Sequence, residues 1–356
     1  MLDVVFGQAS DAGKVRPHNE DAAAAFIPRS GHEARSRGWM FAVADGVGGV
    51  DLGEVASAKA VETMADGFAH SPEGTSLASL LPRLIQNANA AIHNEGLQPD
   101  RRGRHMATTV VSCALRHDLA FVAHVGDSRC YQVRDGAANL LTRDHTWVSE
   151  QRKLGLITET AAERSENRHV LTRSLGPELF VTVETGSVSL KRGDVLVLCT
   201  DGLYGAMYPE DIARIASQNK DAATIAQELV GYAVEVDGAD NATAQVIQIR
   251  STEPMGQYRG RLYPLPLPGR SAIRAIPKAR SSSSQRAKSR PGSTSWQRHL
   301  SEIQADAALV LPFGDRQLPH GATGFGTIEL AAYRRDGVQE GNSGLRERRV
   351  GLSNQA

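Results

Sequence analysis

Five apolar runs rich in β-branched residues, several of which end at Asp-Gly or Gly-Asp, constrain the fold of this chain more than any other feature. Runs of this length between turn residues predict β-strands. Short turns join some of them, as in AFVAHVGDSRCYQVRDGAANLL, where Asp135-Gly136 predicts a hairpin; this favours antiparallel sheets over strict strand–helix alternation. The runs cover residues 40–46, 107–115, 119–127, 194–202 and 242–250.

Helical patterns separate these runs. The longest predicted helix, residues 76–95, carries Leu77, Leu81 and Leu84 on one stripe, although Pro82 makes its first turn uncertain. An α+β protein is therefore expected. Further helices are predicted at 54–69, 145–154, 209–218 and 221–235.

Length and composition indicate a globular protein. A chain of 356 residues with 41% hydrophobic residues can build a substantial core. No stretch approaches the roughly 18 apolar residues that span a bilayer, and the N-terminus lacks a signal-peptide pattern. Cys113, Cys130 and Cys199 lie in apolar runs, without the spacing of a zinc site. We therefore expect a cytoplasmic protein with buried, reduced thiols.

Charge and composition divide the chain into three parts. Residues 1–250 hold 24 Lys and Arg against 32 Asp and Glu, whereas residues 251–300 hold 10 against 1. The segment 251–296 is rich in Pro, Ser and Arg, which predicts a disordered basic linker. Residues 297–356 carry only short apolar pieces, so we expect a mostly disordered tail or a small appendage after one domain of residues 1–250.

Two aspartates, Asp45 and Asp201, each end a fully apolar run and precede a glycine. A carboxylate there is costly to bury without a partner, and a divalent cation is a natural one. The glycine lets the backbone approach closely, and the run GVGG at residues 46–49 also frees a carbonyl for coordination. Because Asp-Gly is equally a turn signal, this pair alone leaves a metal site and a turn both open.

Further acidic residues recur near predicted strand ends. Arg16, Glu20 and Asp21 lie within six residues, Asp127 follows AFVAHVG, and Asp240 stands just before the last strand. A single charge cluster is usually a solvated face, but acids at several strand ends can converge. Such convergence builds an all-oxygen site for hard cations.

Eight motifs occur in order along about residues 5–250: DAGKVRPHNEDA, FAVADGVGG, ATTVV, HVGDSRCYQVRDG, LTRDHTWV, LTRSLG, LVLCTDGLY and DNATAQVIQI. In this order and spacing they closely resemble the bacterial form of the PPM family of metal-dependent protein phosphatases, also called type 2C serine/threonine phosphatases. One motif would be weak evidence, but the full series is very specific. The resemblance makes residues 1–250 a phosphatase catalytic domain.

The resemblance implies a central sandwich of two antiparallel β-sheets flanked by α-helices, with a site for two Mn²⁺ or Mg²⁺ ions at one end. By motif, Asp45 bridges the two metals, and the Gly46 carbonyl binds one of them. Asp201 and Asp240 complete the shell of the second metal. Asp127, together with Asp201, matches the position that holds a third, weaker metal.

The implied reaction is hydrolysis of phosphoserine and phosphothreonine on proteins, opposing Ser/Thr kinases. Two close cations lower the pKa of a shared water, which attacks phosphorus, so Asp45 and Asp201 act in catalysis through the metals. Glu20 and Asp21 bind metal directly or through water. Arg16 matches the residue that grips the phosphate, which its planar guanidinium suits.

One position departs from eukaryotic relatives, which have a histidine after the metal-bridging Asp-Gly where this chain has Val47. The leaving alkoxide then needs another proton donor: a metal-bound water is the first candidate and His18 the second. We predict that Asp144 caps a helix N-terminus and is not catalytic. Residues 146–180 match the variable flap of the family, which should influence which phosphoproteins fit.

Two alternatives come from other functional classes. The first is an inactive phosphatase-like binding module, which the complete set Asp45, Asp201 and Asp240 argues against. The second treats the basic stretch 259–298 as a nucleic-acid or membrane tether, but the stretch has few aromatics, so a solvated linker or a protein-docking segment is favoured. The expected partners are phosphoproteins and a Ser/Thr kinase, and the expected state is a monomer.

Overall fold

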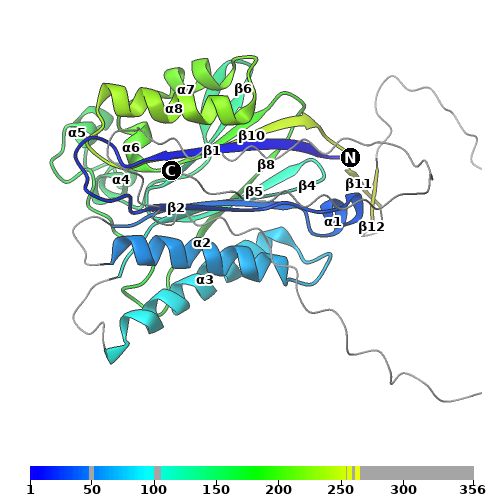
Figure 1. Ribbon diagram of the computed structural model, residues 1–356, viewed down its shortest axis with the longest axis horizontal. Helices are drawn as coiled ribbons and strands as arrows, with labels where there is room; N and C mark the ends of the chain where they lie inside the picture. The colour runs from blue at the N-terminus through cyan, green and yellow to red at the C-terminus, as the bar shows by residue number, and fades with distance from the viewer. Residues whose placement is uncertain (48–51, 100–105, 254, 259–260, 265–356) are drawn as a thin grey trace, which may run out of the picture.

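The computed structural model describes residues 1–47, 52–99, 106–253, 255–258 and 261–264, and two five-stranded antiparallel sheets form its centre (Figure 1). The first has the order β1-β10-β9-β6-β7, with bounds Asp3–Asp11, Ala242–Ser251, Val195–Cys199, Arg129–Arg134 and Ala137–Leu140. The second has the order β2-β3-β4-β5-β8, with bounds Asp21–Phe26, Trp39–Asp45, Val110–Arg116, Leu119–Val125 and Glu184–Ser189.

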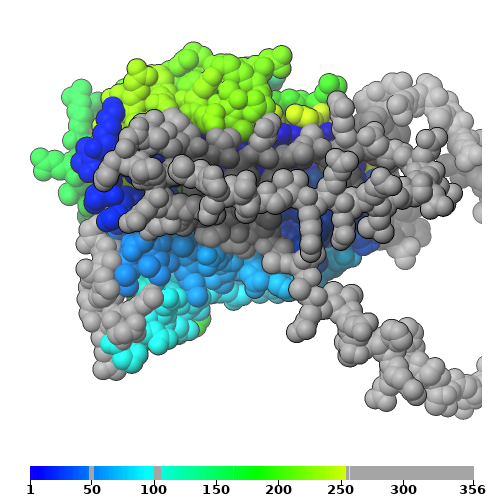
Figure 2. All heavy atoms as spheres, in the orientation of Figure 1, coloured from blue at the N-terminus to red at the C-terminus, as the bar shows by residue number. Residues whose placement is uncertain are grey.

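Helices cover the outer face of each sheet. α2 and α3 (Gly53–Ala69, Leu77–Gly96) pack on the second sheet, and α7 and α8 (Pro209–Ala216, Ala222–Val236) pack on the first, so the two layers form opposite sides of the molecule (Figure 2). The short helices α4, α5 and α6 (Trp147–Lys153, Glu159–Glu163, Asp201–Tyr204) gather at one end of the sandwich, away from α1 (Gly31–Ser36). No helix among the described residues is long and apolar enough to cross a membrane.

The central strands are apolar on both faces because both faces are covered. In β3, Phe41 and Val43 belong to the core between the sheets, whereas Met40, Ala42 and Ala44 belong to the core under α2 and α3. Side chains alternate along a strand, so double burial removes the polar alternation of a half-exposed strand. A third core lies under α7 and α8. This layering confirms the predicted α+β sandwich.

The predicted elements are present, with small shifts at their ends. Each of the five apolar runs contains a strand, and the five predicted helices occur, Pro82 lying inside α3. The Asp135-Gly136 hairpin is confirmed: it joins β6 to β7, and both residues have positive φ, 53° and 79°. All three cysteines are free and buried, as predicted.

The prediction that Asp144 caps a helix is wrong. Helix α4 begins two residues later than the predicted position, and the Thr146 hydroxyl caps it by accepting a hydrogen bond from Ser149 N–H. Asp144 instead forms a two-point ion pair with Arg129, at 3.0 Å to Nε and 2.7 Å to Nη2. A partly buried guanidinium that bonds a carboxylate at two points binds it more strongly than one backbone N–H does.

The predicted linker contains regular structure at its start. Ser251 still pairs with Asp3 in the β1–β10 ladder, and residues Met255–Tyr258 and Arg261–Pro264 form the two-stranded sheet β11–β12. Averaging composition over the whole segment 251–296 hides these two short runs, which contain tyrosines and a leucine. Residues 265–356, with the rest of the predicted linker and the tail, lie outside the described residues.

Candidate metal and phosphate site

Strand ends bring the predicted acidic residues together at the end of the sandwich that carries α4, α5 and α6 (Figure 1). Asp21 begins β2 and Asp45 ends β3, directly opposite each other in register. Asp201 follows β9 and Asp240 precedes the neighbouring strand β10. Asp127 lies in the turn between β5 and β6. The negative charges of these four aspartates all raise the pKa of Asp45, which indicates that the five carboxylates lie close together.

Asp21 is a buried carboxylate with one oxygen unsatisfied. Its Oδ2 accepts hydrogen bonds from the hydroxyls of Thr200 (2.9 Å) and Thr243 (2.6 Å), whereas Oδ1 is buried with no hydrogen-bond partner among the described residues. Burial raises the pKa of Asp21 to about 7, and the two hydroxyls act in the opposite direction. Since an unpaired buried carboxylate oxygen is costly, Oδ1 fits the role of a cation ligand.

Asp45 combines a fixed backbone with an uncompensated side chain. Its carbonyl accepts hydrogen bonds from the Thr108 hydroxyl (2.7 Å) and Thr109 N–H (2.8 Å), and its N–H donates to the Thr109 hydroxyl (3.2 Å). Burial raises the pKa of the Asp45 carboxyl well above its usual value, and the negative charges of Asp21 and Asp201 raise it further. A cation would reverse this effect because it favours the charged carboxylate.

Asp127 and Asp201 form a second acidic pair. Asp127 is 5% exposed, and burial raises its pKa to about 7, with the charge of Asp201 as the next cause. The Asp201 side chain is 20% exposed. The two acids therefore lie at the edge of the buried cluster, where solvent reaches one of them.

Arg16 and Glu20 come from the loop between β1 and β2. Arg16 Nη2 donates to Asp240 Oδ2 at 2.7 Å, and this bond raises the pKa of Arg16. Burial raises the pKa of Glu20, which Arg16 opposes. The Glu20 backbone is held on both sides: its N–H donates to Asn241 Oδ1 (2.8 Å) and its carbonyl accepts from Gly46 N–H (3.0 Å).

The glycines behind Asp45 and Asp201 are required by close backbone contacts. A Cβ on Gly46 would lie 2.5 Å from the carbonyl of Gly53, and one on Gly202 would lie 2.1 Å from the carbonyl oxygen of Asn241. No side chain fits at either position without moving backbone. The predicted role of these glycines in close approach is confirmed.

Sequence reasoning misses the uncharged residues that hold the acids. Thr200 and Thr243 bind Asp21, Thr108 binds the backbone of Asp45, and Asn241 ties the loop after β1 to β10 through Ala12 O (2.9 Å). Their position in the sequence could have identified two of them, because Thr200 directly precedes Asp201 and Asn241 directly follows Asp240. Hydroxyl and amide side chains beside functional acids are candidate supports.

The flap reaches the site through a histidine that the sequence does not single out. His169 Nδ1 lies 3.6 Å from Asp201 Oδ2, and this contact raises the pKa of His169. His18, the earlier candidate proton donor, is exposed, and its carbonyl accepts from Asn241 Nδ2 at 3.0 Å. Val47 donates its N–H to Ala107 O (3.0 Å) and offers no titratable group.

The donor set fits hard divalent cations. Its members offer carboxylate oxygens and backbone carbonyls, which Mg²⁺ and Mn²⁺ prefer. The buried acids raise one another's pKa and Asp21 has an unsatisfied oxygen, so the protein supplies more negative charge than Arg16 neutralises. Such a cluster can hold metal ions and, beside Arg16, a phosphate group.

Known proteins resemble this chain in sequence and in fold. The sequence profile described as protein phosphatase 2C matches residues 17–231. A serine/threonine phosphatase, stp, of Listeria monocytogenes is 30% identical over 244 residues, covering 67% of this chain and 93% of the relative. The fold agrees with the sequence match. The serine/threonine phosphatase PstP/Ppp of Mycobacterium tuberculosis superposes with a TM-score of 0.61 at 30% identity, covering 70% of this chain and 100% of that structure.

A second solved structure adds metal ions to the comparison. It is the catalytic domain of the serine threonine protein phosphatase PstP in complex with two manganese ions, with a TM-score of 0.58 and 30% identity, covering 70% of this chain and 99% of that structure.

Proposed function

Because this chain belongs to the protein phosphatase 2C family, we propose that it is a metal-dependent phosphatase that hydrolyses phosphoserine and phosphothreonine on proteins. The observation that carries the proposal is the buried carboxylate cluster, above all Asp21 Oδ1, which has no hydrogen-bond partner in the part of the chain that the structure describes. The similarity of the chain to a phosphatase with two bound manganese ions supports the same assignment. We assign the catalytic domain to the residues up to about 250, as the motifs indicate.

The members of the carboxylate cluster would hold the cations. Asp45 would bridge two ions, Asp201 and Asp240 would complete the shell of one, and the Gly46 carbonyl would bind the other. Asp127 and Asp201 would hold a third, weaker ion. Glu20 and Asp21 would bind directly or through water, and the direction of the Asp21 pKa supports a role for its carboxylate.

Each protein group has a chemical task in this proposal. Bound divalent cations supply an activated water and neutralise charge on the phosphoryl group. Arg16 orients the phosphate with its planar guanidinium; its contact with Asp240 keeps it at the edge of the cluster. His169 contacts Asp201 and the charge of His18 acts on Glu20, so the leaving oxygen would take its proton from one of these histidines or from a water in the site.

The flap would select protein substrates. Of the fourteen large hydrophobic side chains that are exposed in the described residues, six lie within residues 146–180. Trp147 begins α4 and Leu154 directly follows its last residue; they are 50% and 70% exposed, and a spacing of seven residues places them on one side of the helix. Val170 accepts a hydrogen bond from Trp147 N–H and is adjacent to His169, which contacts Asp201. These side chains would contact substrate residues around the phosphorylated one.

The natural partners would then be phosphoproteins and the Ser/Thr kinase that modifies them. We further propose that the protein acts as a monomer in the cytoplasm.

Hydrolysis of a phosphothreonine peptide with Mn²⁺, with and without a chelator, tests the proposal. We expect activity only with metal, and a loss of several orders of magnitude in Asp201→Asn. Asp135→Asn is the matched control, because Asp135 occupies the same Asp-Gly dipeptide in an exposed hairpin and should leave activity unchanged. Activity that persists in excess chelator would contradict the mechanism.

A further inference from the structure

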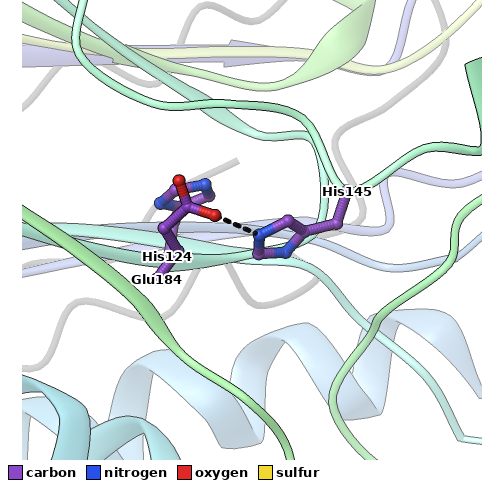
Figure 3. A group of neighbouring side chains, drawn as sticks. All are labelled: His124, His145 and Glu184. Carbon is purple, nitrogen blue, oxygen red and sulfur yellow. Dashed lines mark hydrogen bonds and ion pairs between the residues drawn. The ribbon is translucent and has the colours of Figure 1, made fainter. Parts of the chain in front are cut away.

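A second polar cluster lies beside the carboxylate site. It consists of His124 at the end of β5, His145 just before α4 and Glu184 at the start of β8 (Figure 3). The two imidazole rings stack with centroids 4.8 Å apart and 16° between their planes, and His145 Nε2 lies 3.3 Å from Glu184 Oε2. His145 is completely buried. Two histidines and a carboxylate this close raise the question of a metal site.

The contacts of the cluster argue against a metal there. His145 Nδ1 accepts a hydrogen bond from Gly126 N–H (3.1 Å), and His124 Nε2 bonds to the Arg143 carbonyl (2.9 Å). The nitrogen lone pairs of an imidazole lie in the plane of its ring, so the lone pairs of these two stacked rings lie in nearly parallel planes. The ligands of one metal ion must instead point toward a common centre. The guanidinium of Arg143 lies 2.8 Å from Glu184 Oε2, so a cation would meet positive charge.

The hydrogen bonds define the state of His145. His145 Nε2 lies 3.3 Å from both Glu184 Oε2 and Arg173 Nη1. Because Nδ1 accepts from Gly126, the neutral ring carries its proton on Nε2, and of these two neighbours only the Glu184 carboxylate can accept it. Burial, followed by the neighbouring His124 and Arg173, lowers the pKa of His145 to about 4, which agrees with a neutral ring. The ring is therefore locked at both nitrogens.

His145 connects two functional parts of the molecule. Its ring and its backbone N–H both bind Gly126, at 3.1 and 3.0 Å, directly before Asp127. Its carbonyl accepts from Thr172 N–H (2.8 Å), where the returning end of the flap meets the sandwich. Gly126 has a φ of 103°, and a Cβ there would lie 2.5 Å from a Thr109 side-chain atom. The backbone conformation of the turn before Asp127 is thus restricted at Gly126 and held by two hydrogen bonds to His145.

We propose that His145 is a positioning residue that orients the Asp127 carboxylate toward its cation and anchors the flap to the same turn, with Glu184 fixing the ring. The proposal rests on the proposed function, since it concerns a divalent cation at Asp127. Residues that orient metal ligands typically change metal affinity about 10- to 100-fold when replaced. Replacing His145 would change the metal affinity by a factor of this size, although His145 would contact neither the cation nor the substrate.

Two substitutions separate the two bonds of the ring. In His145→Asn the amide oxygen takes the place of Nδ1 and can accept from Gly126 N–H. In His145→Gln the amide reaches the place of Nε2 and can donate to Glu184, but Gly126 N–H loses its partner. The pair is closely matched in polarity. Thermal unfolding of each variant checks that it is folded.

Calorimetric titration with Mn²⁺ gives a readout that does not depend on activity. We expect His145→Gln to weaken the weakest Mn²⁺ site about tenfold, with tighter sites unchanged, and His145→Asn to stay within about twofold of the wild type. The KM for a phosphothreonine peptide should rise in His145→Gln, because the flap loses its fixed anchor. Glu184→Ala, at a partly exposed strand end, should weaken the same site in the same direction and covers the case in which His145→Gln does not fold.

Some results would overturn the proposal. Equal Mn²⁺ affinities in the wild type, His145→Gln and Glu184→Ala would show that His145 does not position Asp127. A Co²⁺ absorption band that disappears in His124→Ala would show that the cluster is a metal site. If the wild type itself neither binds Mn²⁺ nor hydrolyses the peptide, the proposed function fails instead.

Discussion

Replacing Asp21 by asparagine should stabilise the metal-free protein at neutral pH. The folded-state pKa of Asp21 is raised to about 7 from a reference of 3.8. A raised pKa means that the stabilising contribution is fully present below the unfolded-state value and is lost as the pH rises through about 7. Between about pH 4 and pH 7, each pH unit removes up to about 1.4 kcal/mol, so the wild type loses about 3 kcal/mol through this group.

Asparagine does not ionise, so Asp21→Asn should lack this loss. Its side-chain oxygen can still accept from the hydroxyls of Thr200 and Thr243, as Oδ2 does now. Without metal, the variant should match the wild type near pH 4 and exceed it by about 3 kcal/mol near pH 7, a shift of roughly 6–12 °C in Tm for a domain of this size. With Mn²⁺ the order should reverse, because the variant loses a cation ligand.

Thermal unfolding in EDTA and in Mn²⁺, at both pH values, measures these differences. Asp194→Asn is the control: Asp194 is equally buried but binds Arg134 (2.6 Å) and Gln132 (3.1 Å), so its replacement should destabilise the protein at both pH values, with or without metal. The reasoning would be refuted if Asp21→Asn and the wild type showed the same change in Tm between the two pH values in EDTA.

Three further predictions concern phosphate, flap and domain boundary. Arg16→Lys should raise the KM for a phosphothreonine peptide about tenfold, since lysine cannot form the two-point contact; an unchanged KM would exclude Arg16 from phosphate binding. Trp147→Ala should raise the KM for a phosphoprotein at least threefold, because the variant loses roughly 1 kcal/mol of apolar contact with the substrate. Hydrolysis of p-nitrophenyl phosphate, which is too small to reach Trp147, should stay constant. Equal effects on both substrates would place Trp147 in the active site. A chain that ends after residue 253 should keep wild-type peptide hydrolysis and Tm within a few degrees, because it retains the Ser251–Asp3 pair and the Glu253–Arg35 ion pair; a collapse of Tm would move the boundary further along the chain.

Local patterns in the sequence predict the strands and the hairpin well, because apolar runs and turn residues determine these elements locally, whereas the two-sheet sandwich is what the family resemblance implies. The run around Phe41 is apolar on both faces, and Asp135-Gly136 adopts the positive φ values that its residue types favour. Gly46 and Gly202 were identifiable for the same reason, since glycine after a strand-end aspartate signals close backbone approach.

Contacts between distant segments account for what the sequence does not predict. Asp144 follows a local capping pattern, but Arg129 binds it from the neighbouring strand. The hydroxyl of Thr243 binds Asp21 across 222 residues, and His145 meets Glu184 across 39. No motif spacing encodes these pairs without a known topology. The family resemblance identifies the acids but not the side chains that hold them.

The pairing of Asp21 with Asp45 across β2 and β3 would couple correct strand alignment to the proposed metal binding. If β2 slipped by a single position, alternation would turn the Asp21 side chain to the opposite face of the sheet, and Ala22 would stand opposite Asp45. A chain with this misaligned strand would thus lack one of the proposed manganese ligands. If both carboxylates hold the proposed cations, divalent cations would stabilise the one strand alignment in which Asp21 and Asp45 meet.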